Sequence, residues 1–395
     1  MSVQKVSDAM ITALNASKLT GTVEDACFPA TLPAISGANL TNLPASGKQI
    51  MEYTSDPAIN TNPADGLGTL WLNKTSGELF CCTDATANAN VWANVGEGTG
   101  EVSPGYDVDY LVVAGGGAGT TSGTSMMSAG GGGGGLRTST AGGSGGGGSS
   151  ESQMRMTGGT VYAITVGGGG SSDSENGTNS SIIGGAVNLA SVGGGAAAVN
   201  PPSVAANSGG SGGGGYSADD MSGGSGTANQ GYDGGDGITS GSRYPTAGGG
   251  GAGEVGHSFN VHNNTDGGAG KQVNIDGNNY YFSGGGGGAS HSPATPASGG
   301  IGGGGKGMSY TTSATGSPGG SAITSDADIH GGTNTGGGAG GTTWYYSSGS
   351  NGGSGCVILR IPTAKYTGTR TGSPTVSTSG SDTILTYTGT GTYTA

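Results

Sequence analysis

Apolar residues in this chain are concentrated in a few short segments, and polar and glycine-rich sequence separates them. Three segments have the β-branched and apolar content of buried strands: VDYLVVAGGG (Val108–Gly117), VYAITVGGGG (Val161–Gly170) and GCVILRIP (Gly355–Pro362). Two of them bracket a long glycine-rich region, and the third lies inside it. The pattern predicts a mostly non-helical chain with strands at the borders of residues 105–362.

Residues 1–50 are interpreted as a fibrous leader. LNASKLTGTV (Leu14–Val23) and ISGANLTNLP (Ile35–Pro44) share an apolar–polar–small pattern and look like two imperfect copies of a short β unit. These fifty residues contain too few large apolar side chains to form a stable core by themselves. Partner chains would therefore have to bury the apolar side chains. Similar short units occur in phage fibre shafts, where three chains wrap together, and this resemblance implies a homotrimer; the alternative is a disordered N-terminal arm.

Two further segments predict short β modules. In residues 51–104, GTLWLNKTSGELFCCTDATANANVWANVG (Gly68–Gly96) alternates like strands and carries Trp71 and Trp92. We expect these tryptophans to form the core of the module; the alternative is that they are exposed and stack on sugars. Residues 363–395 alternate β-branched with small polar residues, which suits a hairpin that caps the glycine-rich region or pairs with another chain.

Glycine accounts for 94 of the 395 residues, against a usual share of about 7%. It occurs in short runs that carry no side chains for a conventional apolar core. One interpretation is flexible linker, since glycine loses much entropy on ordering. The other is a bundle of polyglycine II rods, which have about three residues per turn and no internal hydrogen bonds. Parallel rods can then bond to one another through their backbones.

The arrangement of the runs favours the rod bundle. Linkers are monotonous, whereas here runs of similar length alternate with loops that differ, and strands bracket the region. Each hydrogen bond contributes about 0.5–1.5 kcal/mol net. Many bonds in one lattice can therefore offset an ordering cost of about 1–2 kcal/mol per residue. The sequence predicts short β modules and a polyglycine II helix bundle in an elongated modular fibre.

The borders of this region carry a family resemblance. DYLVVAGGGAG (Asp109–Gly119) and NGGSGCVILRIP (Asn351–Pro362) resemble the two ends of the glycine-rich domain of phage tail fibres and tail-tip adhesins. The GGSGGGG, GGGGAG and TNTGGGAGG blocks between them are similar to the same family. The resemblance implies a polyglycine II sandwich whose loops bind a host-surface receptor, either an outer-membrane protein or a surface glycan. It also implies contacts with other tail or fibre proteins.

Charge and hydropathy limit the classes of binding partner that we expect. Only 9% of residues are charged and the formal net charge is −13, which is unfavourable for binding a phosphate backbone, so we expect no nucleic-acid partner. No apolar stretch reaches 18 residues, and the start of the chain lacks the apolar core of a signal peptide. We therefore expect no membrane insertion, synthesis in the host cytoplasm, and a final location on the virion.

No motif predicts catalysis, a cofactor or a metal. The GxGxxG matches are expected by chance in so glycine-rich a chain. Asp233 and Asp236 are similar to part of a calcium β-roll repeat, but without tandem copies. His257 and His262 share a loop without nearby cysteines. Further acidic candidates are interpreted as turn formers, at Asp219–Asp220, Asp326 and Asp328. The cysteines are interpreted as small buried hydrophobes, with a vicinal disulfide or a metal site as the alternative: Cys27, Cys81, Cys82 and Cys356.

The loops between the runs combine aromatic residues with Ser, Gly and Asn, as binding loops of antibodies do. If the strand at Asp107–Ala114 leads outward and Gly352–Pro362 returns beside it, the far tip of the bundle carries two loops, Thr120–Ser128 after the first segment and Thr342–Asn351 before the second. The predicted receptor-binding residues are Trp344, Tyr345, Tyr346, Met126 and Met127 at this tip, followed by Tyr280, Tyr281 and Phe282. The alternative for each aromatic is that it covers the rods.

Two functions therefore follow from the sequence. The first is a non-enzymatic phage tail-fibre or tail-tip protein that recognises the host surface. The second is a purely structural fibre segment, with another chain making the receptor contact. An ice-binding polyglycine II protein fits the glycine runs but not the N-terminal modules or the irregular loops.

Overall fold

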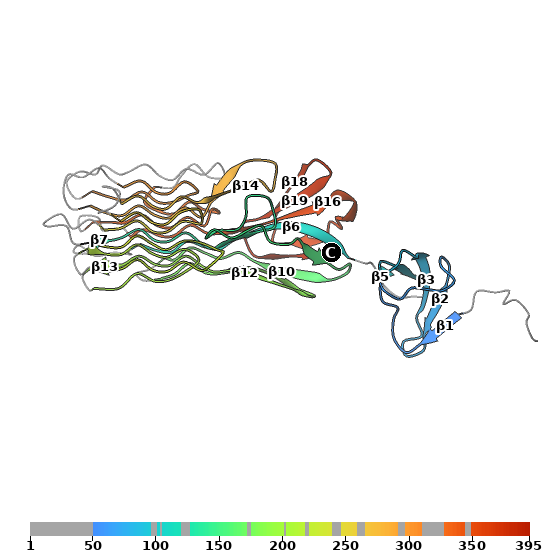
Figure 1. Ribbon diagram of the computed structural model, residues 1–395. Coiled ribbons are helices and arrows are strands. Elements are labelled where there is room, and N and C mark those ends of the chain that lie inside the picture. Colours follow the sequence, from blue (N-terminus) through green and yellow to red (C-terminus); the bar gives the residue numbers. More distant parts are fainter. Residues whose placement is uncertain are drawn as a thin grey trace, which may run out of the picture. The chain divides into compact units, whose positions relative to one another are not determined.

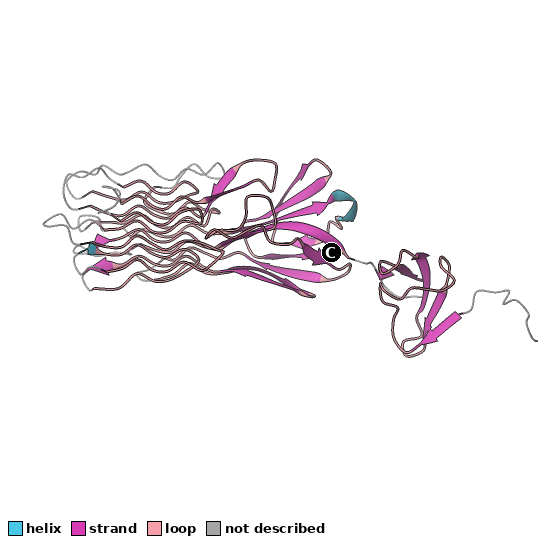
Figure 2. Ribbon diagram, in the orientation of Figure 1, coloured by secondary structure: helices cyan, strands magenta, loops and turns pink. Residues whose placement is uncertain are grey.

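The computed structural model describes residues 50–95, 101–102, 105–119, 127–171, 175–200, 203–217, 221–238, 246–258, 265–290, 297–309, 328–343 and 349–395. Within these ranges the chain has strands and extended segments but no α-helix, and η7 (Thr363–Lys365) is a short 3-10 turn (Figure 2). The non-helical prediction is confirmed for this part of the chain. The predicted leader, apart from Ile50, lies outside the described residues, and so do its expected contacts.

The first sheet belongs to the small N-terminal module. Its strands lie in the order β1-β2-β3-β4-β5: β1 (Ile50–Tyr53), β2 (Leu70–Asn73), β3 (Leu79–Asp84), β4 (Val91–Asn94) and β5 (Glu101–Val102). One face buries Trp71, Phe80, Cys82 and Trp92. The two tryptophan rings meet edge-on at 5.8 Å, and Trp92 is fully buried. The expectation that the tryptophans form the core is confirmed.

The predicted strand pair at the borders of the glycine-rich region is present. β6 (Tyr106–Val113) and β16 (Cys356–Pro362) pair antiparallel, with Val113 opposite Cys356 and Asp109 opposite Arg360. They lie at the centre of a sheet of order β18-β19-β16-β6-β8, in which β9 also pairs with β6. The remaining strands are β8 (Leu136–Thr138), β9 (Met154–Met156), β18 (Thr375–Ser379) and β19 (Asp382–Tyr387).

A second sheet packs on the first and completes a sandwich. Its order is β12-β11-β10-β20-β17: β10 (Val161–Thr165), β11 (Ser180–Gly184), β12 (Val187–Ser191), β17 (Arg370–Thr371) and β20 (Gly391–Thr394). The main core is shared by the two sheets, with Val108, Tyr162, Leu359, Tyr387 and Tyr393 among its fully buried members. The C-terminal segment therefore supplies strands to both sheets and closes the core.

The other face of the central strands is also covered, which explains why β6 and β16 are almost continuously apolar. Leu111 and Ile358 point into a second cluster together with Val273 and Phe282. These last two residues belong to the hairpin of β14 (Lys271–Val273) and β15 (Tyr280–Phe282). Burial on both faces therefore selects apolar residues at consecutive positions.

Glycine segments extend from the sandwich and lie side by side (Figure 1). The run Gly130–Gly135 shows how they are held. Its backbone N–H groups donate, in chain order, to the carbonyl oxygens of Ala247, Ala339, Gly195, Gly250, Gly336 and Val192, at distances of 2.7–3.0 Å. Every third residue thus returns to the same neighbour. The run also accepts bonds from three further segments, through the N–H groups of Ala114, Gly117, Ser211, Gly214 and Gly286.

Close approach of backbones explains why these positions are glycine. A Cβ added at Gly131, Gly132 or Gly133 would lie closer than 3.0 Å to backbone atoms of a neighbouring segment. Such a separation cannot be relieved by moving a flexible side chain. On outer segments, by contrast, non-glycine residues recur every third position and face solvent, as Ser222 and Ser225 do.

Adding a single methyl group should therefore destabilise the fold at an interior glycine but not at an outer one. We expect Gly133→Ala to lower the free energy of unfolding by a few kcal/mol, because the methyl group collides with the backbone of Ser283. Gly168→Ala is the matched control, since Gly168 is exposed and an added Cβ meets only Thr178 Oγ1 at 4.0 Å. Thermal denaturation measures both; equal melting temperatures would contradict close-packed segments.

Candidate functional site

The glycine segments end, opposite the sandwich, in a layer that we call the loop-bearing end. We define it by Ser128, Thr246, Ser290, Ser309 and Thr342, which lie beside or one residue from sequence outside the described ranges. The two-stranded sheet of β7 (Met127–Ser128) and β13 (Val199–Asn200) lies in the same layer (Figure 1). Chain positions far apart in sequence therefore meet here.

Hydrogen bonds hold this layer together. Ser128 N–H donates to the Thr342 carbonyl and Thr342 N–H donates to Ser128 Oγ, both at 3.1 Å. The Thr246 hydroxyl lies 3.1 Å from the carbonyl oxygens of both Ser128 and Ala289 and shares its one proton between them, and it accepts the Ala289 N–H at 2.7 Å. Ser128, Thr246 and Thr342 are almost completely buried. The positions at which neighbouring sequence joins the layer are thus fixed by the scaffold.

The predicted tip residues can be placed in part. Met127 is buried in a small cluster with Ala198, Tyr216 and Ala289, and is only 1% exposed. The expectation that its side chain contacts a receptor is therefore wrong, because Met127 fills a gap under the layer. Met126 lies outside the described residues.

Trp344, Tyr345 and Tyr346 also lie outside the described residues, but the chain on both sides is placed. Gly119 N–H donates to the Ser350 carbonyl at 3.0 Å. The Ser350 hydroxyl donates to the Gly340 carbonyl at 2.6 Å. The predicted apposition of the chain before residue 120 with the chain after residue 348 is confirmed by these bonds.

The second predicted loop lies elsewhere. β14 and β15 pack on the sandwich, and Arg360 donates to the Ile275 carbonyl at 3.2 Å. Phe282 is 1% exposed and belongs to the second apolar cluster. The prediction that Phe282 contacts a receptor is therefore wrong. Tyr280 and Tyr281 are partly exposed, at the end of the segments opposite to the loop-bearing end.

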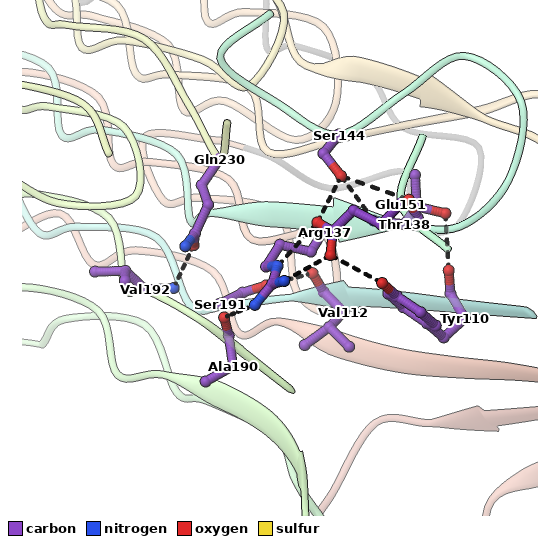
Figure 3. Close-up of polar contacts among 10 residues, drawn as sticks. All are labelled: Tyr110, Val112, Arg137, Thr138, Ser144, Glu151, Ala190, Ser191, Val192 and Gln230. Carbon is purple, nitrogen blue, oxygen red and sulfur yellow. Dashed lines mark hydrogen bonds and ion pairs between the residues drawn. The ribbon is translucent and has the colours of Figure 1, made fainter. Parts of the chain in front are cut away.

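A polar cluster occupies the junction of the sandwich and the glycine segments (Figure 3). Arg137 on β8 pairs with Glu151, and its Nε donates to Oε1 at 2.9 Å. The hydroxyls of Tyr110 and Ser144 also donate to the Glu151 carboxylate, at 2.9 and 3.0 Å. Arg137 Nη1 donates to the Ala190 carbonyl of β12 at 3.1 Å, so the pair joins the edge strands of the two sheets.

Burial and hydrogen bonding act on the pKa of Glu151 in opposite directions. Burial raises the pKa of this carboxyl, but the hydrogen bonds from Arg137, Tyr110 and Ser144 outweigh burial and hold the pKa below its usual value. Burial and the bond to Glu151 raise the pKa of Tyr110. The sequence analysis missed this cluster; the available signal was an arginine in the short strand after a glycine run, in a chain with only 12 Lys and Arg residues.

Other candidate residues make polar contacts within the glycine-rich region. Asp233 and Asp236, which resembled part of a calcium repeat, accept the backbone N–H groups of Gly226 and Gly223 at 2.7 and 3.0 Å. His257 lies 3.3 Å from Glu254. Among the described residues, no group of three or more His, Cys, Asp or Glu is arranged to hold a metal ion.

The three described cysteines, Cys81, Cys82 and Cys356, are free thiols. Cys82 and Cys356 are buried, in line with the interpretation as small hydrophobes, and burial raises the pKa of Cys356 to about 12. Cys27 lies outside the described ranges. In the part of the chain that is described, no helix is long and apolar enough to cross a bilayer.

The lowered pKa of Glu151 predicts acid sensitivity. Its stabilising contribution is complete above the unfolded-state pKa, near the ordinary value of 4.5, and is lost as pH falls through the lower folded-state pKa. Between pH 7 and pH 3 we expect the parent to lose more unfolding free energy than Glu151→Gln. Asp107→Asn, which removes the exposed ion pair with Arg155, is the control and should change little. Parallel losses in the parent and Glu151→Gln would contradict the assignment.

Comparison with known proteins agrees with this architecture at the level of the family. A family model described as a glycine-rich domain matches residues 93–362. A search of curated proteins and a search of solved structures returned no match. The matched span includes β6, β16 and all the glycine segments between them. The chain therefore belongs to the glycine-rich domain family.

Proposed function

We propose that the glycine segments of residues 105–362 form a polyglycine II lattice. The contacts of Gly130–Gly135 support this conformation, because its donors return to the same neighbour every third residue. A helix with three residues per turn and no internal hydrogen bonds produces that pattern. Asp233 and Asp236 are both exposed and lie three residues apart, which is the same period.

On this scaffold we propose a bacteriophage tail-fibre or tail-tip protein that recognises a bacterial surface receptor. The observation that carries the proposal is the hydrogen-bonded layer of the loop-bearing end, where separate chain segments are fixed next to one another. Loops that bind are best displayed on a rigid scaffold. The receptor is an outer-membrane protein or a surface glycan, the role is non-enzymatic, and the protein acts on the virion beside other tail proteins.

The test uses aromatic residues from both ends of the lattice. We expect alanine at Trp344, Tyr345 and Tyr346 together to abolish binding to host cells, since these aromatics supply large contact area at low entropic cost. Blocking of phage adsorption by the purified chain measures binding, and circular dichroism checks the fold. Alanine at Tyr280 and Tyr281 is the control and should leave adsorption blocking unchanged.

The outcome distinguishes the two candidate functions. If the parent chain neither binds host cells nor blocks adsorption, it is a structural fibre segment and another chain recognises the host. If blocking survives the triple change but is lost on substitution of Tyr280 and Tyr281, the receptor site lies at the sandwich end.

We also propose assembly as a homotrimer through residues 1–50. The two short β units of this leader contain too few apolar residues to fold alone. Analytical ultracentrifugation should show a trimer for the full chain and a monomer once residues 1–49 are removed. A full-length monomer would refute the proposal, and a dimer would refute the threefold arrangement.

A further inference from the structure

An open hollow of about 480 Å³ lies beside the Arg137–Glu151 pair, and its volume is within the usual range for small-molecule sites. It is lined by Arg137, Ser149, Ser150, Glu151, Ala228, Asn229 and Gln230. We propose that this hollow binds an uncharged, hydroxyl-rich ligand, namely a neutral glycan of the bacterial surface. The site is separate from the loop-bearing end, although the bacterial source of the glycan rests on the proposed function.

The charges in the hollow are already balanced. The Arg137 guanidinium faces the Glu151 carboxylate, which accepts bonds from Arg137, Tyr110 and Ser144. An arginine side chain has five N–H donors. Three of them are engaged with Glu151 and the Ala190 carbonyl, so two remain. The pair therefore offers fixed hydrogen-bond donors without net charge, and 28% of the Arg137 side chain is exposed.

The backbone of Asn229 is the second observation. Its φ is 60°, in the left-handed region, where this chain uses glycine at most positions and asparagine at three of them, Asn88, Asn229 and Asn334. Asn88 and Asn334 have the same conformation, and the side chain of each makes hydrogen bonds, with Asn62 and Ser354 respectively. The side chain of Asn229 has no hydrogen-bond partner among the described residues. Asn229 is exposed in a turn, so its amide is open to a ligand in the hollow.

Gln230 presents a further donor in a fixed position. Its side-chain oxygen accepts the Val192 N–H at 2.8 Å, which holds the amide in one orientation (Figure 3). Its amide nitrogen makes no hydrogen bond within the described part of the chain. Ser149, which is exposed, adds a hydroxyl to the lining of the hollow. Amide, guanidinium and hydroxyl groups therefore converge on the hollow from three chain segments.

This combination of groups selects the ligand class. The lining has no unpaired charge that would favour a phosphate or a carboxylate, and Ala228 is its one apolar side chain. Sugar hydroxyls both donate and accept, so they match the free amide of Asn229 and the remaining donors of Arg137 and Gln230. A neutral saccharide fits these requirements better than an apolar molecule or an anion.

The experiment starts from the full chain on an array of bacterial surface polysaccharides, and titration calorimetry then measures the best neutral glycan. We expect Asn229→Gly to weaken binding at least tenfold without lowering the melting temperature, because glycine suits the positive φ. Ser149→Ala should also weaken binding. Asn334→Gly is the matched control, and its affinity should equal that of the parent.

Alanine at Trp344, Tyr345 and Tyr346 should leave this glycan affinity unchanged, which separates the hollow from the loop-bearing end. The proposal is overturned if no neutral glycan binds, or if only charged glycans bind. It is also overturned if Asn229→Gly binds the glycan as tightly as the parent.

Discussion

Backbone hydrogen bonding between segments without side chains is the interaction on which the glycine-rich region depends. Each residue of Gly130–Gly135 donates one bond to a neighbouring segment, so stability is spread over many small contributions. This arrangement requires the backbones to come so close that a Cβ would collide with the next carbonyl group. Interior positions are therefore glycine because the neighbouring backbones leave no room for a side chain. The conformational entropy that glycine loses on ordering opposes folding, and the hydrogen bonds must outweigh it.

The sandwich supplies the large apolar core that the glycine segments lack. Apart from the small cluster around Met127, their described residues form no apolar core of their own. Each of their hydrogen bonds contributes only about 0.5–1.5 kcal/mol net, because water satisfies the same groups in the unfolded chain. The two sheets bury Val108, Leu359 and Tyr387 and fix where the segments begin. Since the strands come from both borders of the region and from the C-terminal segment, the core closes only when distant parts of the chain meet. Ordered glycine segments therefore depend on a conventional core at one end.

The sequence predicted the strongly apolar elements well. β6 and β16 were recognisable because burial on both faces makes them almost continuously apolar, and Trp71 and Trp92 were expected in a core. The sequence did not reveal that Met127 and Phe282 are buried. In a chain with so few large apolar residues, loop aromatics and methionines look like binding groups. Their burial depends on gaps between segments that only the three-dimensional packing defines.

The polar cluster was missed for a related reason. Arg137 and Glu151 are separated by a glycine-rich turn, and no spacing rule pairs them. The roles of Asp233 and Asp236 were equally hidden, because they accept N–H groups from residues 7 and 13 positions earlier in the chain, at spacings that no local pattern marks. An ionised Asp or Glu carboxylate accepts hydrogen bonds but donates none. Local patterns therefore identify strands, whereas the partners of polar residues depend on the order of the segments.

The three-residue period of contacts limits how the sequence can change in length. In a helix of three residues per turn, deleting one residue from a run rotates all following donors by about 120°. Every bond beyond the deletion would then be directed at the wrong neighbour. Because the donors of Gly130–Gly135 return to the same neighbour every third residue, we expect insertions and deletions inside a run to be tolerated only in multiples of three.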